Sequence, residues 1–522
     1  MVQRDRDPDP PRHRPERVLL ALIGGVLFFS LARTIVDPDL WGHVRFGGDL
    51  FRTGRLVRPD PYSYLSGSIP WINHEWLAEA LFYAAYRAVG GTGLVLLKMA
   101  VGLTAMGLVL AHLLRRGMST LHAVLVLCIA FALVSVGSTT LRPQIFTYLG
   151  LVLLVLALDA VDRGRTGWLW SVPMVLAAWV NLHGGFLAGV ALLLLWGGVH
   201  LLTAWARRRR GEPPHGPSLI VVAVAVAAGV LATFLNPYGV GLWTFLLETA
   251  TIARPEISEW GQTPLATWEG LCYLLLLSGA GYAMIDREGR PGLPMLAIFV
   301  ALAIGALTAI RHLPLFGLAA PIVAADSLAV LSRRRGRTSG GAARRLRLAP
   351  LLLLVSAGLL ALAIPWLRGP RLEAERQPFP ALAVGLLRES NVSGNLAIHF
   401  DWGEYAIWHL APAIRVSVDG RRETVYDGEA YQANIQFIFG VGDWDRVLDD
   451  HPTDLALVPR HLPVYNLLLL KPGWSSVYED SVASIFARDG SPLATRIRAT
   501  RPPDLPPDGD GLRFPVAPMR VR

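Results

Sequence analysis

Long apolar runs constrain this chain more than any other feature of its sequence. A membrane-spanning helix needs about 17 to 25 mostly apolar residues, and eleven candidate runs approach or reach that length. They lie near residues 18–36, 93–114, 119–137, 144–161, 168–181, 185–206, 218–236, 270–285, 293–310, 314–331 and 348–366. Only 17% of the 522 residues are charged, against about 25% in soluble domains. The pattern predicts an α-helical polytopic membrane protein with about eleven transmembrane helices in a lipid bilayer.

The charges between these runs predict the orientation of the chain. The leader, residues 1–17, is proline-rich and mixed in charge and has no cleavage motif, so we expect it to remain as a cytoplasmic N-terminal segment. Cytoplasmic loops retain arginine and lysine, and with the N-terminus inside, the short outer loops contain only Arg142, Arg254 and Arg311. The inner segments contain Arg4, Arg6, Arg12, Arg14, Arg17, Arg115, Arg116, Arg163, Arg165, Arg207 to Arg210, Arg287, Arg290 and the run from Arg333 to Arg347. We therefore expect a multi-pass protein of the inner (cytoplasmic) membrane, with its C-terminus outside.

The same distribution excludes other classes of protein. The net charge is +9, but its arginines mark one side of the membrane, which makes nucleic acid an unlikely partner. The two cysteines, Cys128 and Cys272, lie within apolar runs, which excludes a disulfide framework and a thiolate metal site.

The composition changes after the last apolar run, which predicts four regions. Residues 18–366 form the transmembrane domain, with a large first outer loop at 37–92, and residues 367–488 form an extracytoplasmic α/β domain. Within that domain NLAIHF, IRVSV, LALVP, SSVYE and ASIFA are typical of strands, whereas FPALAVGLLRES and VYNLLLL have helical spacing. Residues 489–522 are rich in proline and arginine, and we expect them to be disordered.

Unusual polar residues gather at the outer ends of the predicted helices. Because ionisable groups at membrane depth are costly, their convergence on one side indicates a water-filled site. The segments concerned are Asp37-Pro38-Asp39-Leu40-Trp41-Gly42-His43, Asp60-Pro61, Asn73-His74-Glu75, Arg142-Pro143-Gln144, Asn181-Leu182-His183-Gly184-Gly185, Asn236-Pro237-Tyr238, Glu256, Glu259 and Arg311-His312.

Each of these segments also has a structural interpretation. Asp37 and Asp39 could cap the amphipathic segment that begins at Leu40, and Asp60-Pro61 is a turn signal. The tryptophans fit an interfacial aromatic belt, and the arginines could extend to the interface. In the C-terminal domain, Asp401 to Tyr405 and Asp419 to Arg422 have the polarity of a sugar-facing loop, but Asp-Gly favours a turn. None of these structural interpretations accounts for carboxylates, histidines and arginines on the same side.

A transferase outside the membrane needs an activated donor that the membrane delivers. No Gly-rich phosphate loop is present, and a polyprenyl-phosphate sugar fits the predicted architecture. Its chemistry needs a carboxylate base, for which Asp39 and Asp37 are the candidates, and cations for the departing phosphate. Phosphate partners are Arg142, Arg311 and His312, and further candidate substrate-binding residues are His43, His74, Glu75, Asp60, Asn181 and His183. A divalent cation, Mg²⁺ or Mn²⁺, is a weaker expectation, with Asp37, Asp39 and Glu75 as ligands.

These motifs resemble those of the integral-membrane glycosyltransferases of the GT-C fold class. The similarity is strongest to the bacterial group that resembles protein mannosyltransferases and lipopolysaccharide-core glycosyltransferases. It is carried by DPDLWGHVRFGGDLFRTGRL, DPYSY, HEWLAE, LRPQ, NLHGGF, NPYG and RHLP, with FDWGEYAIWHL and VDGRRETVY near the C-terminus. The resemblance implies an inverting sugar transfer, with a catalytic carboxylate directly after the first helix, at Asp37 or Asp39. Here a proline separates two aspartates where that class more often has adjacent Asp and Glu, which leaves open which aspartate is the base.

Two alternatives to the enzyme come from other classes of protein. A transporter or lipid flippase also contains interrupted helices and buried ionisable residues, but its polar groups belong near the bilayer midplane. A non-catalytic scaffold for envelope assembly predicts that both aspartates can be replaced without loss of function. For the enzyme, we expect an extracytoplasmic acceptor, which is a glycan, a lipid or a protein.

Overall fold

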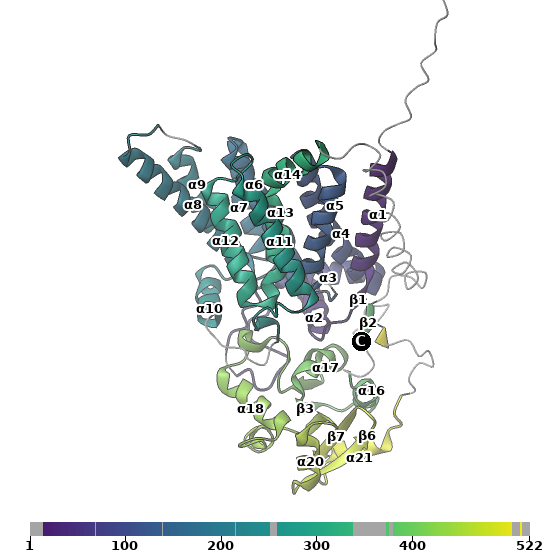
Figure 1. The fold of residues 1–522 in the computed structure, drawn as a ribbon. Helices are drawn as coiled ribbons and strands as arrows, with labels where there is room; N and C mark the ends of the chain where they lie inside the picture. The colour runs from purple at the N-terminus through teal and green to yellow at the C-terminus, as the bar shows by residue number, and fades with distance from the viewer. Residues whose placement is uncertain are drawn as a thin grey trace, which may run out of the picture.

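The computed structural model describes residues 14–67, 69–137, 139–213, 216–250, 258–337, 372–374, 379–503 and 512–513. A bundle of helices stands on a smaller α/β domain (Figure 1). Two short helices of the predicted first outer loop, α2 (Leu40–Thr53) and α3 (Trp76–Val89), lie between them. The bundle consists of α1 (Arg14–Ala32), α4 (Gly91–Arg115), α5 (Thr120–Ser135), α6 (Gln144–Asp162), α7 (Ser171–Trp179), α8 (Phe186–Arg209), α9 (Leu219–Ala232), α10 (Val240–Ala250), α11 (Trp268–Ile285), α12 (Leu293–Thr308), α13 (Leu313–Val323) and α14 (Ala325–Arg337).

Among the described residues, fewer helices than the predicted eleven are long and apolar enough to cross a membrane. Five meet both conditions, α1, α4, α6, α8 and α11, and the bent pair formed by α13 and α14 would make a sixth. Three of the other predicted runs, at α5, α9 and α12, form shorter apolar helices, and the run at 168–181 forms a 3₁₀ turn followed by the nine-residue α7. The predicted run at 348–366 lies outside the described residues.

The pair α13 and α14 shows why an apolar run need not form one straight helix. The two helices meet at an angle of 61°, directly after Pro321 in the last turn of α13. Proline has no N–H to donate and clashes with the preceding turn, which weakens a helix at that point.

The C-terminal region folds as the predicted α/β domain. Its five-stranded sheet has the order β4-β3-β5-β7-β6, and β3 pairs in parallel with β4 and β5, whereas β7 is antiparallel to β5 and β6. The strands coincide with the five predicted segments: β3 (Gly394–Ile398), β4 (Ile414–Val416), β5 (Leu455–Pro459), β6 (Trp474–Glu479) and β7 (Ala483–Arg488). The helices are α16 (Ala381–Glu389), α17 (Gly403–Leu410), α18 (Gly428–Phe439), α19 (Arg446–Asp449), α20 (Pro463–Leu470) and α21 (Pro492–Ala499).

The expectation of a disordered tail from residue 489 is wrong for its first part. Helix α21 occupies Pro492–Ala499, and Ile497 is buried against the domain. The Ser491 side chain accepts a hydrogen bond from the backbone N–H of Ala494, and Pro492 occupies the first helical position. Serine followed by proline is a helix-start signal, which the overall proline content of this region obscured.

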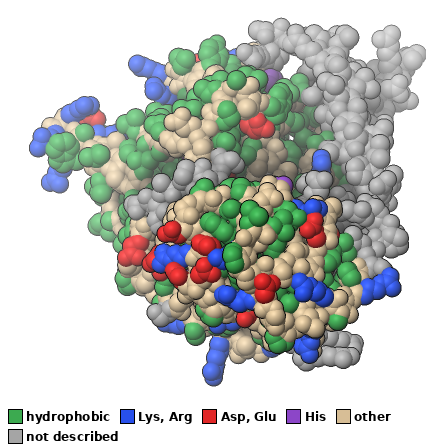
Figure 2. Space-filling model, turned by 90° about the horizontal axis from the view of Figure 1, so that it is seen from below, with side chains coloured by type: hydrophobic (Ala, Val, Ile, Leu, Met, Phe, Trp, Pro, Cys, Tyr) green, Lys and Arg blue, Asp and Glu red, His purple; other side chains and the backbone are tan. Residues whose placement is uncertain are grey.

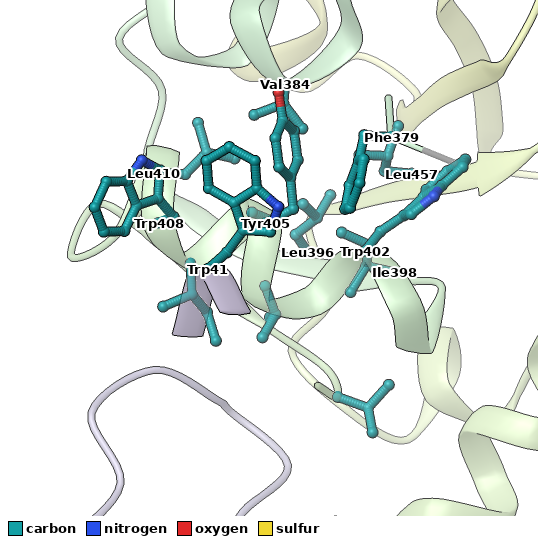
Figure 3. Close-up of a cluster of buried hydrophobic side chains, with 14 of the residues drawn as sticks. Trp41, Phe379, Val384, Leu396, Ile398, Trp402, Tyr405, Trp408, Leu410 and Leu457 are labelled. Carbon is teal, nitrogen blue, oxygen red and sulfur yellow. The ribbon is translucent and has the colours of Figure 1, made fainter. Parts of the chain in front are cut away.

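Aromatic packing joins the α/β domain to the first outer loop. Trp41 in α2 (Leu40–Thr53) packs edge-on against Tyr405 at 5.0 Å and Trp408 at 5.9 Å between ring centroids, both from α17. Figure 3 shows Trp41 beside these two rings, with Phe379 completing the cluster. Buried aromatic side chains contribute about 1.5 to 3 kcal/mol each through burial. We infer that α2 and α17 form one hydrophobic core across the two domains.

Backbone pairing strengthens the same junction. Tyr64 donates its N–H to the carbonyl of Val416 at 3.1 Å, and Val416 donates to the carbonyl of Tyr62 at 2.9 Å, so the loop extends the sheet at β4. A second, three-stranded sheet joins β1 (Thr34–Ile35), β2 (Leu372–Ala374) and β8 (Leu512–Arg513). The opposite face of the α/β domain presents intermixed acidic and basic side chains (Figure 2).

Candidate functional site

A cavity of about 790 Å³ lies where the bundle meets the α/β domain, and a smaller one of about 170 Å³ adjoins it. The predicted site residues that line the large cavity are Asp39, His74, Arg142, His183, Arg311 and His312. His43 and Glu75 line the smaller cavity, together with several of the same residues. The structure thus brings together side chains from loops that lie more than 270 residues apart in the sequence.

Asp39 is the aspartate of the pair that faces the cavity. It occupies the N-cap position of α2, but its side chain makes no capping hydrogen bond, so the carboxylate is not committed to the helix. Burial and the charge of Asp37 raise its pKa to about 7, against the opposing effects of Arg142 and His43. A carboxyl group with this pKa can exchange a proton near neutral pH, as a general base requires.

Asp37 lies behind Asp39 and supports it. Its side chain is buried, accepts the backbone N–H of Asp39 at 3.1 Å and accepts Arg142 Nε at 2.7 Å. Burial disfavours the charged form of Arg142, but the two aspartates outweigh it and raise the arginine's pKa above its ordinary value. Arg142 therefore stays charged beside these carboxylates.

A second arginine stands beside the first at the cavity wall. Arg142 Nη1 and Arg311 Nη1 lie 3.6 and 3.9 Å from the same oxygen of Glu259, and the Arg311 guanidinium lies over the Trp260 ring at 4.2 Å. The two guanidinium groups concentrate positive charge at this wall of the cavity, which favours the binding of an anion. His312 donates from Nδ1 to the Gly305 carbonyl at 3.0 Å, which orients its ring toward the cavity from the start of α13.

The smaller cavity contains Glu75 surrounded by three histidines. Glu75 Oε1 lies 3.7 Å from His74 Nε2 and 3.6 Å from His183 Nε2, and Glu75 Oε2 lies 3.9 Å from His43 Nε2. Burial would raise the pKa of Glu75, but the histidines lower it below its ordinary value.

The histidines themselves differ in charge. Burial lowers the pKa of His183 to about 4, and its Nδ1 accepts the Gly185 N–H at 3.0 Å, so the neutral ring has its proton on Nε2, facing Glu75. Burial also disfavours charge on His43, but its hydrogen bond to Glu79 and the charges of Glu75 and Glu79 raise its pKa to about 9. The pocket therefore offers both donors and acceptors of hydrogen bonds.

The Gly-Gly pair after His183 fits this arrangement. A Cβ on Gly185 would lie 2.4 Å from Thr147 Oγ1, so only glycine permits the close approach of the loop to α6. Thr147 Oγ1 lies 2.7 Å from His183 Nδ1 and accepts the indole N–H of Trp179 at 2.9 Å. The close approach that Gly185 permits thus places Thr147 where it orients His183.

The carboxylates proposed as metal ligands do not fit that role in this arrangement. Both oxygens of Asp37 already accept hydrogen bonds, and Glu75 faces histidines rather than either aspartate. Among the described residues, no group of three or more His, Cys, Asp or Glu side chains has the geometry of a metal site. The expected Mg²⁺ or Mn²⁺ stays a prediction.

Two predicted substrate-binding residues lie away from the cavities. The Asp60 side chain is fully buried and accepts Arg421 Nη1 and Nη2 at 2.7 and 3.1 Å. Asn181 accepts the Trp76 indole N–H at 3.0 Å and donates to the carbonyls of Ala177 and Leu235. Both pack segments of the chain together, because each polar group is used by a neighbouring element.

The α/β domain supplies a wall of the large cavity, including segments that the sequence analysis considered sugar-facing but did not assign to the site. That wall consists of His399, Phe400, Asp401, Gly420, Arg422, Thr424, Tyr431, Ile435 and Phe439. Arg422 donates to the Tyr431 hydroxyl at 2.6 Å, and its guanidinium lies 4.6 Å from the centre of that ring. The turn favoured at Asp419 to Arg422 is present, but it also places residues at the site. Acidic and aromatic residues in FDWGEY and VDGRRETVY were the available signal.

The bundle with its docked α/β domain has the predicted GT-C-like architecture of a multi-pass membrane protein. The same fold occurs in ArnT from Cupriavidus metallidurans, whose crystal structure was determined bound to undecaprenyl phosphate. The two structures match with a TM-score of 0.53 at 15% sequence identity, over 91% of this chain and 98% of the ArnT chain. No protein-family model matches the sequence, and no curated protein matches it.

Proposed function

We propose that the protein is a membrane glycosyltransferase that transfers a sugar from a polyprenyl-phosphate donor to an extracytoplasmic acceptor. The observation that carries the proposal is Asp39, a carboxylate with a pKa of about 7, in a large cavity beside Arg142 and Arg311. The fold shared with ArnT supports it, because that protein was crystallised with undecaprenyl phosphate. The arginine distribution supports a location in the inner membrane, with the cavity outside.

In the proposed reaction, one residue acts as the general base and others bind the departing phosphate. Asp39 removes the proton of the acceptor hydroxyl while the oxygen of that hydroxyl forms a bond to the anomeric carbon of the donor sugar. The bond between the anomeric carbon and the phosphate oxygen breaks at the same time. The electron pair of the broken bond leaves with the polyprenyl phosphate, whose charge Arg142 and Arg311 stabilise. One displacement inverts the anomeric carbon. In this scheme Asp37 is a positioning residue, because it holds Arg142 and the Asp39 backbone.

The test is an assay of the purified protein with a panel of radiolabelled polyprenyl-phosphate sugars and envelope acceptors. Asp39→Asn should lower turnover roughly 100-fold or more, because a general base contributes about 10² to 10⁴. Asp450→Asn, an exposed acid of the α/β domain, is the matched control and should retain full activity. Parallel assays with EDTA or added Mg²⁺ test the expected cation.

The same experiment separates the alternatives. Turnover that survives in Asp39→Asn would remove the proposed base. Movement of the labelled lipid across vesicle membranes without transfer would favour a transporter or flippase. The position of the site argues for transfer, because its polar groups lie at the end of the bundle that meets the α/β domain.

A further inference from the structure

The start of helix α2 is capped in an unusual way. The first four N–H groups of a helix have no acceptor within it, and an aspartate at the N-cap ordinarily accepts one of them. Asp39 occupies that position without doing so. Instead, the N–H of Gly42 donates to Glu404 Oε2 at 3.0 Å, across 362 residues of sequence.

Glu404 reaches this position because two glycines make room for it. It lies in the first turn of α17 and is 2% exposed. A Cβ on Gly42 would lie 2.1 Å from Glu404 Oε2, which no side chain tolerates. A Cβ on Gly420 would lie 2.1 Å from Asp39 Oδ1 and 3.0 Å from Glu404 Oε1. The two carboxyl groups therefore flank the same glycine.

The charges around Glu404 suit this role. Burial and the nearby Asp39 and Asp419 raise its pKa well above the ordinary value, against the effect of Arg421. A protonated Glu404 still accepts the Gly42 N–H through its carbonyl oxygen. Of the two carboxyl groups beside Gly420, Asp39 is then the one that ionises near neutral pH.

We propose that Glu404 is a positioning residue that caps α2 in place of Asp39 and so keeps the Asp39 carboxylate directed into the cavity. The expected effect of Glu404 on catalysis rests on the proposed function, whereas the capping of α2 by Glu404 does not depend on it. The α/β domain thereby helps to set the orientation of the proposed base. When Glu404 is absent, Asp39 turns to the Gly42 N–H that Glu404 otherwise accepts.

Hydrogen exchange at the Gly42 amide tests the cap without an activity assay. Mass spectrometry of the full-length protein in nanodiscs should show exchange about fivefold faster in the double variant Glu404→Ala with Asp39→Ala, the factor that the loss of a cap of ordinary strength gives, and a smaller increase in Glu404→Ala, where Asp39 partly replaces the cap. Glu404→Gln should exchange like the parent, because its amide oxygen accepts the same bond. Asp39→Ala alone should change nothing, whereas Glu404→Ala with Asp39→Ala should exchange faster than Glu404→Ala alone. Glu389→Ala, an exposed acid of the same domain, is the control.

Transfer kinetics test the consequence. Glu404→Ala should lower kcat roughly 10- to 100-fold, the cost of a misplaced catalytic group, with the KM for the donor unchanged, and Glu404→Gln should restore kcat. Unchanged Gly42 exchange in the double variant overturns the cap, and equal exchange in Glu404→Ala and the double variant overturns the rotation of Asp39. A parent protein that transfers no sugar contradicts the proposed function, while the exchange series still decides the inference.

Discussion

The protonation of Asp39 is set by neighbours that act in opposite directions. Burial and the negative charge of Asp37 favour the neutral carboxylic acid, whereas Arg142 and His43 favour the carboxylate. The balance leaves the pKa at about 7, about three units above that of an aspartate in water. Asp39 is therefore a stronger base than an exposed aspartate. At neutral pH, however, Asp39 is ionised in only a fraction of the protein molecules.

The first prediction is a pH profile with one acidic limb. Because a base must be ionised and the pKa of Asp39 is raised to about 7, kcat/KM should fall about tenfold per pH unit below that value and level off above it. Measurement of transfer between pH 5 and 9 checks the midpoint. A profile that is already flat at pH 5 would show that a group with an ordinary carboxylate pKa acts instead.

The second prediction concerns the charge behind the base. Asp37→Asn removes a negative charge that raises the pKa of Asp39, so the midpoint of the acidic limb should move to lower pH. Arg142 also loses its partner at 2.7 Å, so kcat at the plateau should decrease. A comparison of full pH profiles for the parent and the variant separates the two effects. An acidic limb that moves to higher pH would contradict the electrostatic assignment.

At the scale of elements, helix α2 and the turn around Gly420 meet with almost no free space. Gly420 lies between Asp39 and Glu404, and any side chain there would collide with the Asp39 carboxylate. The turn therefore does more than reverse the chain, because it closes the cavity against the N-terminus of α2.

The third prediction tests this contact with a single methyl group. In Gly420→Ala the added Cβ would lie 2.1 Å from Asp39 Oδ1, so transfer should fall roughly 100-fold, as for a catalytic group displaced by about 1 Å. Gly428→Ala, at the start of α18 with no atom within 4 Å of the added Cβ, should retain activity. Transfer kinetics and thermal unfolding of both variants provide the measurement. Equal losses in the two would indicate a general destabilisation.

The elements that the sequence predicted well are those whose signals are local. The short, largely apolar segments LALVP and ASIFA placed strands at Leu455–Pro459 and Ala483–Arg488, because length and composition suffice to indicate a buried strand. Breaks within apolar runs were missed, as at Pro321, since hydrophobicity does not report where a helix bends. Helix α21 was missed because one Ser-Pro start signal stood in a proline-rich region.

For the molecule as a whole, a buried arginine joins the two domains. Arg421 of the α/β domain pairs with Asp60 of the first loop at 2.7 Å and with Asp419 at 2.6 Å. Its guanidinium also lies 4.7 Å from the centre of the Trp71 ring. Buried charges of this kind are stable only while each of them keeps its partner of opposite charge.

The fourth prediction is a large loss of stability in Arg421→Ala. Two buried carboxylates would lose their partner, which costs about 3 to 5 kcal/mol, and the α/β domain should detach from the loop at lower temperature. The stability of Arg421→Lys should lie between those of the parent and Arg421→Ala, because lysine retains the charge without the paired hydrogen bonds. Arg446→Ala, whose partners are exposed, should change the unfolding temperature little. Thermal unfolding followed by tryptophan fluorescence provides the comparison.

The same contacts explain which site residues the sequence could indicate. Asp39, Arg142 and Arg311 were predicted because the ends of apolar runs reveal which polar residues share one face. Asp60 was assigned to the site, although Arg421 covers it, and Gly420 and Arg422 were left out. Pairings across more than 360 residues leave no periodic trace in a single sequence, so only the folded structure distinguishes these cases.

The cavity between the bundle and the α/β domain has a consequence for biosynthesis. Asp39 emerges from the ribosome among the first residues, whereas Glu404, Gly420 and Arg422 follow after the bundle has been translated. A nascent chain that ends before residue 399 contains every helix of the bundle described here and lacks one wall of the cavity. Translation therefore completes the wall of the cavity last.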